Sequence, residues 1–214
     1  MNRTRVKICG ITRVEDACAA IDSGADALGL VFCSKSPRYV ELSVAANIAR
    51  TIGPFVTIVG LFVNAGEAQV REAVKTVGLD MLQFHGDEDE VYCAQFERPY
   101  IKAIRMSPEL DVKEVMTKYP SARGFLFDAW NKDKYGGTGE TFEWDRLSIL
   151  KESVDTDIPF ILAGGLTPEN VDQAVAAVKP YAIDVSGGVE LSPGIKSPEL
   201  IQQFIDRSNS GEMS

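Results

Sequence analysis

RVKICGITRVEDACAAIDSGADALGLVF, residues 5–32, contains the unit from which the rest of the chain is built. A short apolar run ends at Cys9, a segment with one apolar face covers residues 14–23, and a second apolar run covers residues 27–32. Short apolar runs rich in β-branched residues predict strands, and an apolar period of 3.6 residues predicts a helix. The stretch therefore predicts a strand, a helix and a second strand in succession.

The same succession repeats along the whole chain, with no linker and no shift in composition. Strands are expected at residues 5–9, 27–32, 56–63, 81–84, 100–105, 124–128, 160–163 and 182–185. Helices are expected at residues 14–23, 44–51, 68–77, 91–96, 112–118, 144–151, 171–178 and 198–206. Eight such units indicate an α/β fold, a single-domain (β/α)8 TIM barrel. A doubly wound sheet is the alternative, but it usually carries a GxGxxG turn after its first strand, where this chain has Gly10 alone.

Composition is that of an ordinary globular domain. The chain has 214 residues, 45% hydrophobic and 25% charged, which is enough for one sizeable core. We expect the barrel to span residues 1–207 and a disordered tail to span residues 208–214. Since the sequence shows no long apolar run and no secretory signal, we expect a cytoplasmic protein. The net charge of -9 argues against nucleic acid and anionic membranes as partners.

The end of the first strand carries the first candidates for chemistry, since TIM-barrel active sites lie at the carboxyl ends of the strands. Cys9 and Lys7 share one face of that strand, and a lysine is hard to bury without an anionic partner. Asp128 ends the sixth strand and is expected across the barrel mouth from Cys9. The other three cysteines are expected to fill the core, and four cysteines without a CxxC pair beside a single histidine predict no metal site.

A long glycine-containing segment follows Asp128. Residues 129–144 include Gly136, Gly137 and Gly139, and this segment is too long for an ordinary connection. We interpret it as a lid that shelters the chemistry from water.

Two glycine turns follow the last two strands. Gly164 and Gly165 come after the seventh, and Ser186, Gly187 and Gly188 come after the eighth. Because the loops after strands seven and eight of such barrels commonly bind phosphate, the pair predicts a shared phosphate site.

Other polar residues near the strand ends give weaker signals. Arg38 follows a turn after the second strand, and its planar fork suits a carboxylate. Gln83 and His85 share a face, but the histidine has no visible catalytic partner. The acidic run over residues 87–90 is interpreted as a solvated helix start.

Several of these motifs together resemble the phosphoribosylanthranilate isomerase family of tryptophan biosynthesis. The resemblance spans nearly the whole chain, and "VKICGIT" near the start with "DVSGGVELSPGIK" near the end is its most specific part. It implies an Amadori rearrangement of an anionic phosphosugar, N-(5-phosphoribosyl)anthranilate, to a ketosamine, without metal or organic cofactor. Its implied catalytic residues are Cys9 as general base and Asp128 as general acid.

The resemblance also implies where the substrate binds. Arg38 lies near the anthranilate moiety, and the last two glycine turns hold the phosphate. Asp184, on the same strand face as Ser186, is a further candidate substrate contact. This chain has "QFHG" where "QLHG" is frequent, and "SGGVE" where "SSGVE" is frequent, so a hydroxyl at position 187 is missing. Whether a histidine-pathway aldosylamine is also accepted, and whether the protein is a monomer or a homodimer, stay open.

The chemistry needs one proton donor and one acceptor. A free cysteine is only about 3% ionised at pH 7, so we expect the charge of Lys7 to lower the pKa of Cys9. Desolvation beneath the lid is expected to keep Asp128 protonated. The rival interpretations are an indole-glycerol-phosphate synthase-like barrel, which would have a longer N-terminal extension, and a non-catalytic phosphometabolite sensor, which would have no use for Cys9, Asp128 and a lid.

Overall fold

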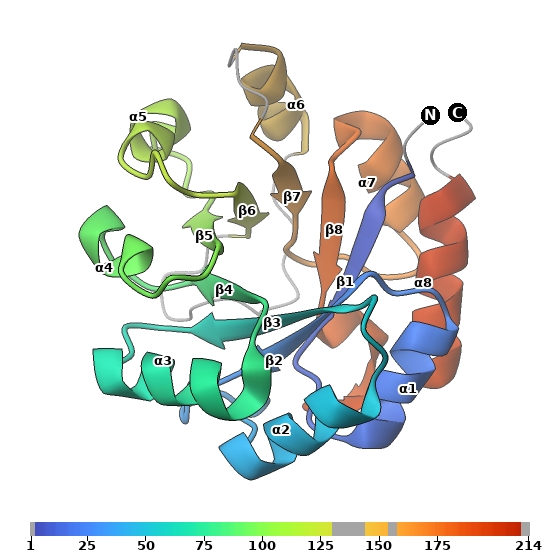
Figure 1. Cartoon of the computed structure of the whole chain (residues 1–214). Coiled ribbons are helices and arrows are strands. Elements are labelled where there is room, and N and C mark those ends of the chain that lie inside the picture. Colours follow the sequence, from blue (N-terminus) through green and yellow to red (C-terminus); the bar gives the residue numbers. More distant parts are fainter. Residues whose placement is uncertain (1–2, 130–143, 154–157, 211–214) are drawn as a thin grey trace.

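The computed structural model describes residues 3–129, 144–153 and 158–210. Eight parallel strands close into a barrel in chain order, and helices surround it (Figure 1). The strands are β1 (Arg5–Cys9), β2 (Ala27–Val31), β3 (Thr57–Phe62), β4 (Met81–Phe84), β5 (Tyr100–Arg105), β6 (Gly124–Asp128), β7 (Phe160–Leu162) and β8 (Ala182–Val185). The helices are α1 (Val14–Asp22), α2 (Leu42–Thr51), α3 (Glu67–Ala73), α4 (Glu90–Ala94), α5 (Val112–Thr117), α6 (Trp144–Ser153), α7 (Val171–Val178) and α8 (Pro198–Ser210). The predicted (β/α)8 barrel is therefore confirmed.

The elements differ from the predicted ones mainly at their ends. After α3 the chain continues as a π turn over Val74–Gly78, and α8 runs to Ser210, three residues into the predicted tail. Residues 211–214 lie outside the described part of the chain. The sequence did not predict a 3-10 turn (Gly187–Val189) and a hairpin of β9 (Glu190–Ser192) and β10 (Ile195–Lys196) after β8. Strands this short carry no readable period.

Apolar side chains form two separate cores. The larger one lies between the strands and the helices, because every second strand residue faces outward onto an apolar helix face. The smaller one fills part of the barrel interior and consists of Ile101, Ala103, Leu126, Ile161, Ala163 and Ala182. These residues share the inward faces of β5 to β8. Lys7, Asp128 and Asp184 are buried polar residues on inward faces nearer the mouth, and this contrast places the site.

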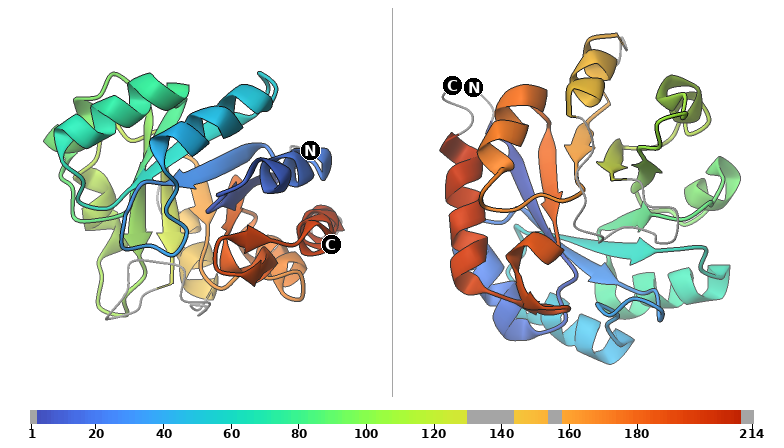
Figure 2. Two further views of the ribbon diagram at one scale, coloured as in Figure 1. Left: turned by 90° about the horizontal axis from the view of Figure 1, so that it is seen from below. Right: turned by 180° about the vertical axis from the view of Figure 1, so that it is seen from behind.

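The helix α8 closes the shell of helices. It packs against α7 on one side and α1 on the other, which joins the end of the chain to its beginning, as the rear view in Figure 2 shows. In the described ranges, no helix has the length and apolar character needed to cross a membrane.

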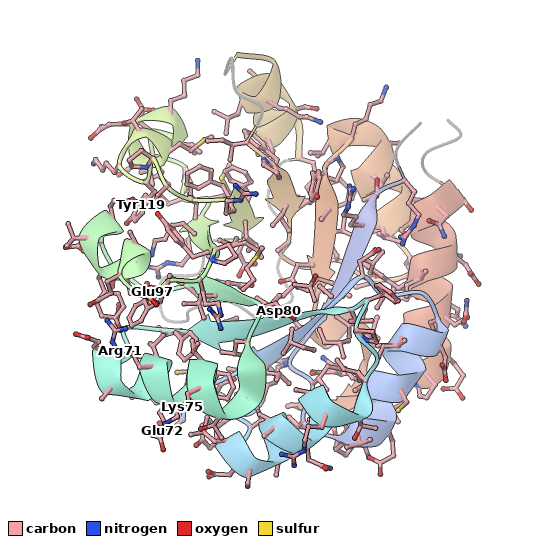
Figure 3. The ribbon with its side chains drawn as sticks, viewed as in Figure 1. Arg71, Glu72, Lys75, Asp80, Glu97 and Tyr119 are labelled. Atoms are coloured by element: carbon pink, nitrogen blue, oxygen red, sulfur yellow. The ribbon has the colours of Figure 1, made fainter. Side chains whose placement is uncertain are left out.

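A buried carboxylate anchors the loop after β4. Glu88 accepts hydrogen bonds from the backbone N–H groups of Asn64 (2.7 Å) and Gly86 (2.9 Å) and from Lys102 Nζ (3.0 Å). The hydroxyl of Tyr119, labelled in Figure 3, donates to the Glu88 carbonyl at 2.9 Å. The interpretation of this acidic run as solvated is therefore wrong for Glu88, because it pairs with a lysine that faces outward from β5.

Candidate active site

Lys7 and Asp184 form a buried ion pair on adjacent strands. They are register partners of β1 and β8, and Lys7 Nζ donates to Asp184 Oδ1 at 2.7 Å. Burial alone would lower the pKa of Lys7, but Asp184 and the sulfur of Cys9 outweigh it, so the pKa is raised and the lysine stays charged. Lys7 thus has the anionic partner that its burial requires.

Cys9 lies on the same face as Lys7 and is 4% exposed. Its register partner on β2 is Gly29, where an added Cβ would lie 2.7 Å from Cys9 Sγ. Burial raises the pKa of the thiol, and Lys7 and Lys196 only partly oppose it. Lys7 does lower the pKa of Cys9, as expected, but burial outweighs this effect and Asp184 raises the pKa further, so the net shift is upward.

Asp128 lies at the end of β6 with a nitrogen atom near each of its carboxyl oxygens. Oδ1 accepts the backbone N–H of Ala129 at 2.9 Å, and Oδ2 lies 3.2 Å from His85 Nε2. The other ring nitrogen of His85, Nδ1, lies 3.1 Å from Gln83 Nε2. The histidine that seemed partnerless in the sequence therefore contacts the predicted acid. No local pattern links positions 85 and 128, so only the closing of the barrel brings them together.

The side chain of Arg38 is held by the hairpin after β8. Its Nε and Nη2 donate to the two carboxyl oxygens of Glu190, both at 2.8 Å, and Lys196 Nζ donates to Glu190 Oε1 at 2.8 Å. Burial opposes the ionised carboxylate, but the two cations outweigh it and lower the pKa of Glu190. Sequence reasoning gave neither Glu190 nor Lys196 a role, although both lie in the "GVELSPGIK" motif, the one signal that could have found them.

The loops after β7 and β8 touch through their backbones. A Cβ at Gly188 would lie 1.9 Å from the carbonyl oxygen of Leu166, so the approach requires glycine. Gly164 and Gly165 both have positive φ, and a Cβ at Gly164 would lie 2.4 Å from the backbone nitrogen of Ala129. The two turns predicted to share a phosphate are therefore adjacent at the barrel mouth.

Lys196 adds a positive charge beside the turn after β8. Its Nζ donates to the Ser186 carbonyl at 3.0 Å, and the residue is 1% exposed. A Cβ at Gly187 would lie 3.3 Å from Arg38 Nη2. The turn is thus flanked by two cations whose shared partner is the single carboxylate of Glu190.

The predicted lid residues Gly136, Gly137 and Gly139 lie outside the described residues. A hollow of about 450 Å³ lies on the outer shell and is lined by residues between Met106 and Lys113 and by Ile149 and Leu150. None of the predicted site residues lines it, so it is not the predicted site. Among the described residues, no group of three or more histidine, cysteine or acidic side chains could hold a metal ion.

A family model and a curated relative that match this sequence carry the same name. Residues 6–207 match the family model of N-(5'-phosphoribosyl)anthranilate isomerase. The protein of that name from Pseudomonas aeruginosa (strain UCBPP-PA14) is 51% identical over 210 residues, which cover 98% of this chain and 97% of that one.

Solved structures agree with the sequence comparison. Phosphoribosyl anthranilate isomerase from Thermotoga maritima has a TM-score of 0.87 at 37% identity, covering 97% of this chain and 99% of that one. An isomerase of the same name in complex with reduced 1-(o-carboxyphenylamino)-1-deoxyribulose 5-phosphate has a TM-score of 0.83 at 36% identity, again with 97% and 99% coverage.

Proposed function

The chain belongs to the N-(5'-phosphoribosyl)anthranilate isomerase family, and from this premise we propose that it converts N-(5-phosphoribosyl)anthranilate to 1-(2-carboxyphenylamino)-1-deoxyribulose 5-phosphate by general acid and base catalysis. The observation that carries the proposal is that Cys9 and Asp128 both lie at carboxyl ends of strands, β1 and β6, of one barrel whose β7 and β8 turns meet at the mouth. The reaction is a step of tryptophan biosynthesis.

Asp128 is the proposed acid and Cys9 the proposed base. Asp128 gives a proton to the ring oxygen of the ribose, the bond from that oxygen to the anomeric carbon breaks, and an iminium forms with the anthranilate nitrogen. Cys9 then removes the proton from the neighbouring carbon, which gives an enolamine. Tautomerisation of the enolamine yields the ketosamine, so no electron leaves the substrate and no cofactor is needed.

The charges around Cys9 favour its ionisation, whereas burial opposes it. The two ion-paired groups beside it hold three cations and two carboxylates, namely Lys7, Arg38, Lys196, Asp184 and Glu190. This leaves one net positive charge, which a thiolate would neutralise. Burial outweighs this positive charge in the unliganded protein, because the pKa of the Cys9 thiol is raised overall.

The remaining residues hold the two ends of the substrate. The turns with Gly164, Gly165, Ser186, Gly187 and Gly188 bind its phosphate through backbone N–H groups. Arg38 binds the anthranilate carboxylate with Nη1, the guanidinium nitrogen that does not contact Glu190. Asp184 contacts the sugar with Oδ2, because its Oδ1 is engaged by Lys7.

Removal of either reacting group tests the assignment. Cys9→Ser and Asp128→Asn are each expected to lower kcat by about 100-fold or more. Turnover is measured from the fluorescence change of the anthranilate adduct. Cys18→Ser removes a thiol from α1, away from the barrel mouth, and is expected to keep wild-type kcat. If both site variants fold and turn over within a few-fold of wild type, the assignment fails. A wild-type protein that binds the ketosamine without any turnover would instead support a sensor.

The other properties are proposed on the resemblance and composition. The enzyme works in the cytoplasm, uses neither metal nor organic cofactor, and does not bind nucleic acid, since its net charge is -9.

A further inference from the structure

Gln83 lies inside the barrel beneath the proposed acid and has no role in the reaction as described above. It is on β4, is 0% exposed, and reaches His85 two residues later on the same strand face. Gln83 contacts the His85 ring through Nε2, which lies 3.1 Å from Nδ1. Its Oε1 is buried and has no hydrogen-bond partner among the described residues. A buried amide oxygen without a partner costs free energy, so this orientation must be favoured by another interaction.

The hydrogen bonds determine which ring nitrogen of His85 carries the hydrogen. An amide Nε2 is only a donor, so the His85 Nδ1 that it faces must be an acceptor. The single hydrogen of the neutral ring is then on Nε2, which points at Asp128 Oδ2 at 3.2 Å. Turning the amide over would leave both hydrogens of Nε2 buried without an acceptor, and orphaned buried N–H groups are rarer than orphaned carbonyl oxygens.

This arrangement matters for a proton donor. A neutral imidazole that faced Asp128 with a bare nitrogen would be a stronger base than a carboxylate and would take the proton meant for the sugar. With the hydrogen already on Nε2, the ring cannot accept that proton. Toward Asp128 the ring can only donate, and together with the Ala129 N–H it fixes both carboxyl oxygens in position.

We propose that Gln83 is a positioning residue that holds His85 with its ring hydrogen on Nε2, so that the imidazole orients Asp128 and does not compete with the substrate for its proton. The loop that carries His85 is held rigidly enough for this role, because Glu88 fixes the adjacent Gly86 backbone through a 2.9 Å hydrogen bond. The inference rests on the proposed role of Asp128 as the acid.

The test uses the fact that His85 is the only histidine in the chain. In protein purified without a histidine tag, isotope-edited NMR of the ring nitrogens reports a single imidazole. We expect hydrogen on Nε2 and a bare Nδ1 in the wild type at neutral pH. A wild-type spectrum with hydrogen on Nδ1, or on both nitrogens, overturns the proposal without any measurement of turnover.

Two variants connect the spectrum to activity. Gln83→Glu replaces the donor with an acceptor of the same shape, so both ring nitrogens should become protonated and kcat should fall by about 10-fold or more with KM little changed. Gln83→Met removes the donor and should give a mixture of the two ring tautomers with a smaller loss of kcat. Gln203→Glu makes the same charge change on the exposed face of α8 and is the control.

The outcomes separate this inference from the proposed function. If Gln83→Glu changes the ring spectrum but keeps wild-type kcat, the positioning role is wrong. If Asp128→Asn keeps wild-type kcat, the acid assignment is wrong, whatever the ring spectrum shows. Should Gln83→Glu fail to fold, the wild-type spectrum and Gln83→Met still decide the matter.

Discussion

At the scale of single residues, the position of Cys9 depends on the glycine opposite it on the neighbouring strand, because glycine has no side chain. Gly29 on β2 lies opposite Cys9 in the register, and the space that its Cβ would fill is occupied by Cys9 Sγ and, at 3.1 Å, by Lys7 Cε. The glycine has no positive φ to explain it, so the requirement for it is steric rather than conformational. Gly29 therefore leaves the space that the side chains of Cys9 and Lys7 occupy.

Gly29→Ala is expected to displace the sulfur and to lower kcat, because a small shift of a reacting group costs orientation. Overpacking of this kind should also lower the free energy of unfolding by about 1–3 kcal/mol. Gly53→Ala is the matched control, since a Cβ there meets no atom within 4 Å. Urea unfolding and steady-state kinetics of both variants give the answer. A Gly29→Ala protein with wild-type stability and kcat would show that the sulfur has room to move.

At the scale of elements, the β9–β10 hairpin joins parts of the mouth that are far apart in sequence. Glu190 at its start binds Arg38 from the loop after β2, and the Lys196 backbone N–H at its end donates to Asp16 of α1 at 3.1 Å. The turn between its strands contains Gly194 with positive φ, and the Gly194 carbonyl accepts the hydroxyl of Thr12 at 2.5 Å. The hairpin thus connects the loops after β1, β2 and β8 on one side of the site through hydrogen bonds.

Glu190→Gln should weaken the contacts that hold the β9–β10 hairpin to Arg38. The buried Lys196 and the half-buried Arg38 would lose their shared carboxylate, and leaving a buried charge unpaired in this way costs roughly 3–5 kcal/mol. Because Arg38 also loses its orientation, KM should rise more than kcat falls. Glu67→Gln breaks the exposed pair with Arg71 on α3, where side chains are 54% and 49% exposed, and should change stability by only about 0.5 kcal/mol. Equal effects of the two substitutions would contradict the proposed role of the hairpin.

At the scale of the whole molecule, the barrel could be predicted because its evidence is local and repeated. Each unit carries its own apolar period, so the ends of elements such as β1 and α7 were predicted correctly from the sequence alone. Contacts across the barrel carry no such signal. Asp128 was found because it ends a strand, but its contact with His85 depends on closure of the barrel. The ion pair of Glu190 with Arg38 depends on a hairpin too short to predict.

The core also determines how stability responds to alkaline pH. Burial of Cys93, on the inner face of α4, raises its pKa from 9.0 to about 12, and burial of the Tyr119 hydroxyl raises its pKa from 10.0 to about 12. A raised pKa means that the folded state holds its proton at pH values where the unfolded chain has released it. The stabilisation is therefore complete below pH 9.0 for Cys93 and is lost as the pH rises toward about 12.

We expect the free energy of unfolding to fall as the pH rises through this window, by about 1.4 kcal/mol per pH unit for each proton released on unfolding. Cys93→Ala should reduce the slope of the free energy of unfolding against pH by up to the contribution of one proton. The substitution also lowers stability at every pH, because it leaves a small cavity. Cys18→Ala on α1 should leave the slope as it is in the wild type. Urea unfolding at a series of alkaline pH values measures the slope directly, and a Cys93→Ala slope equal to that of the wild type would show that this thiol does not retain its proton in the folded core.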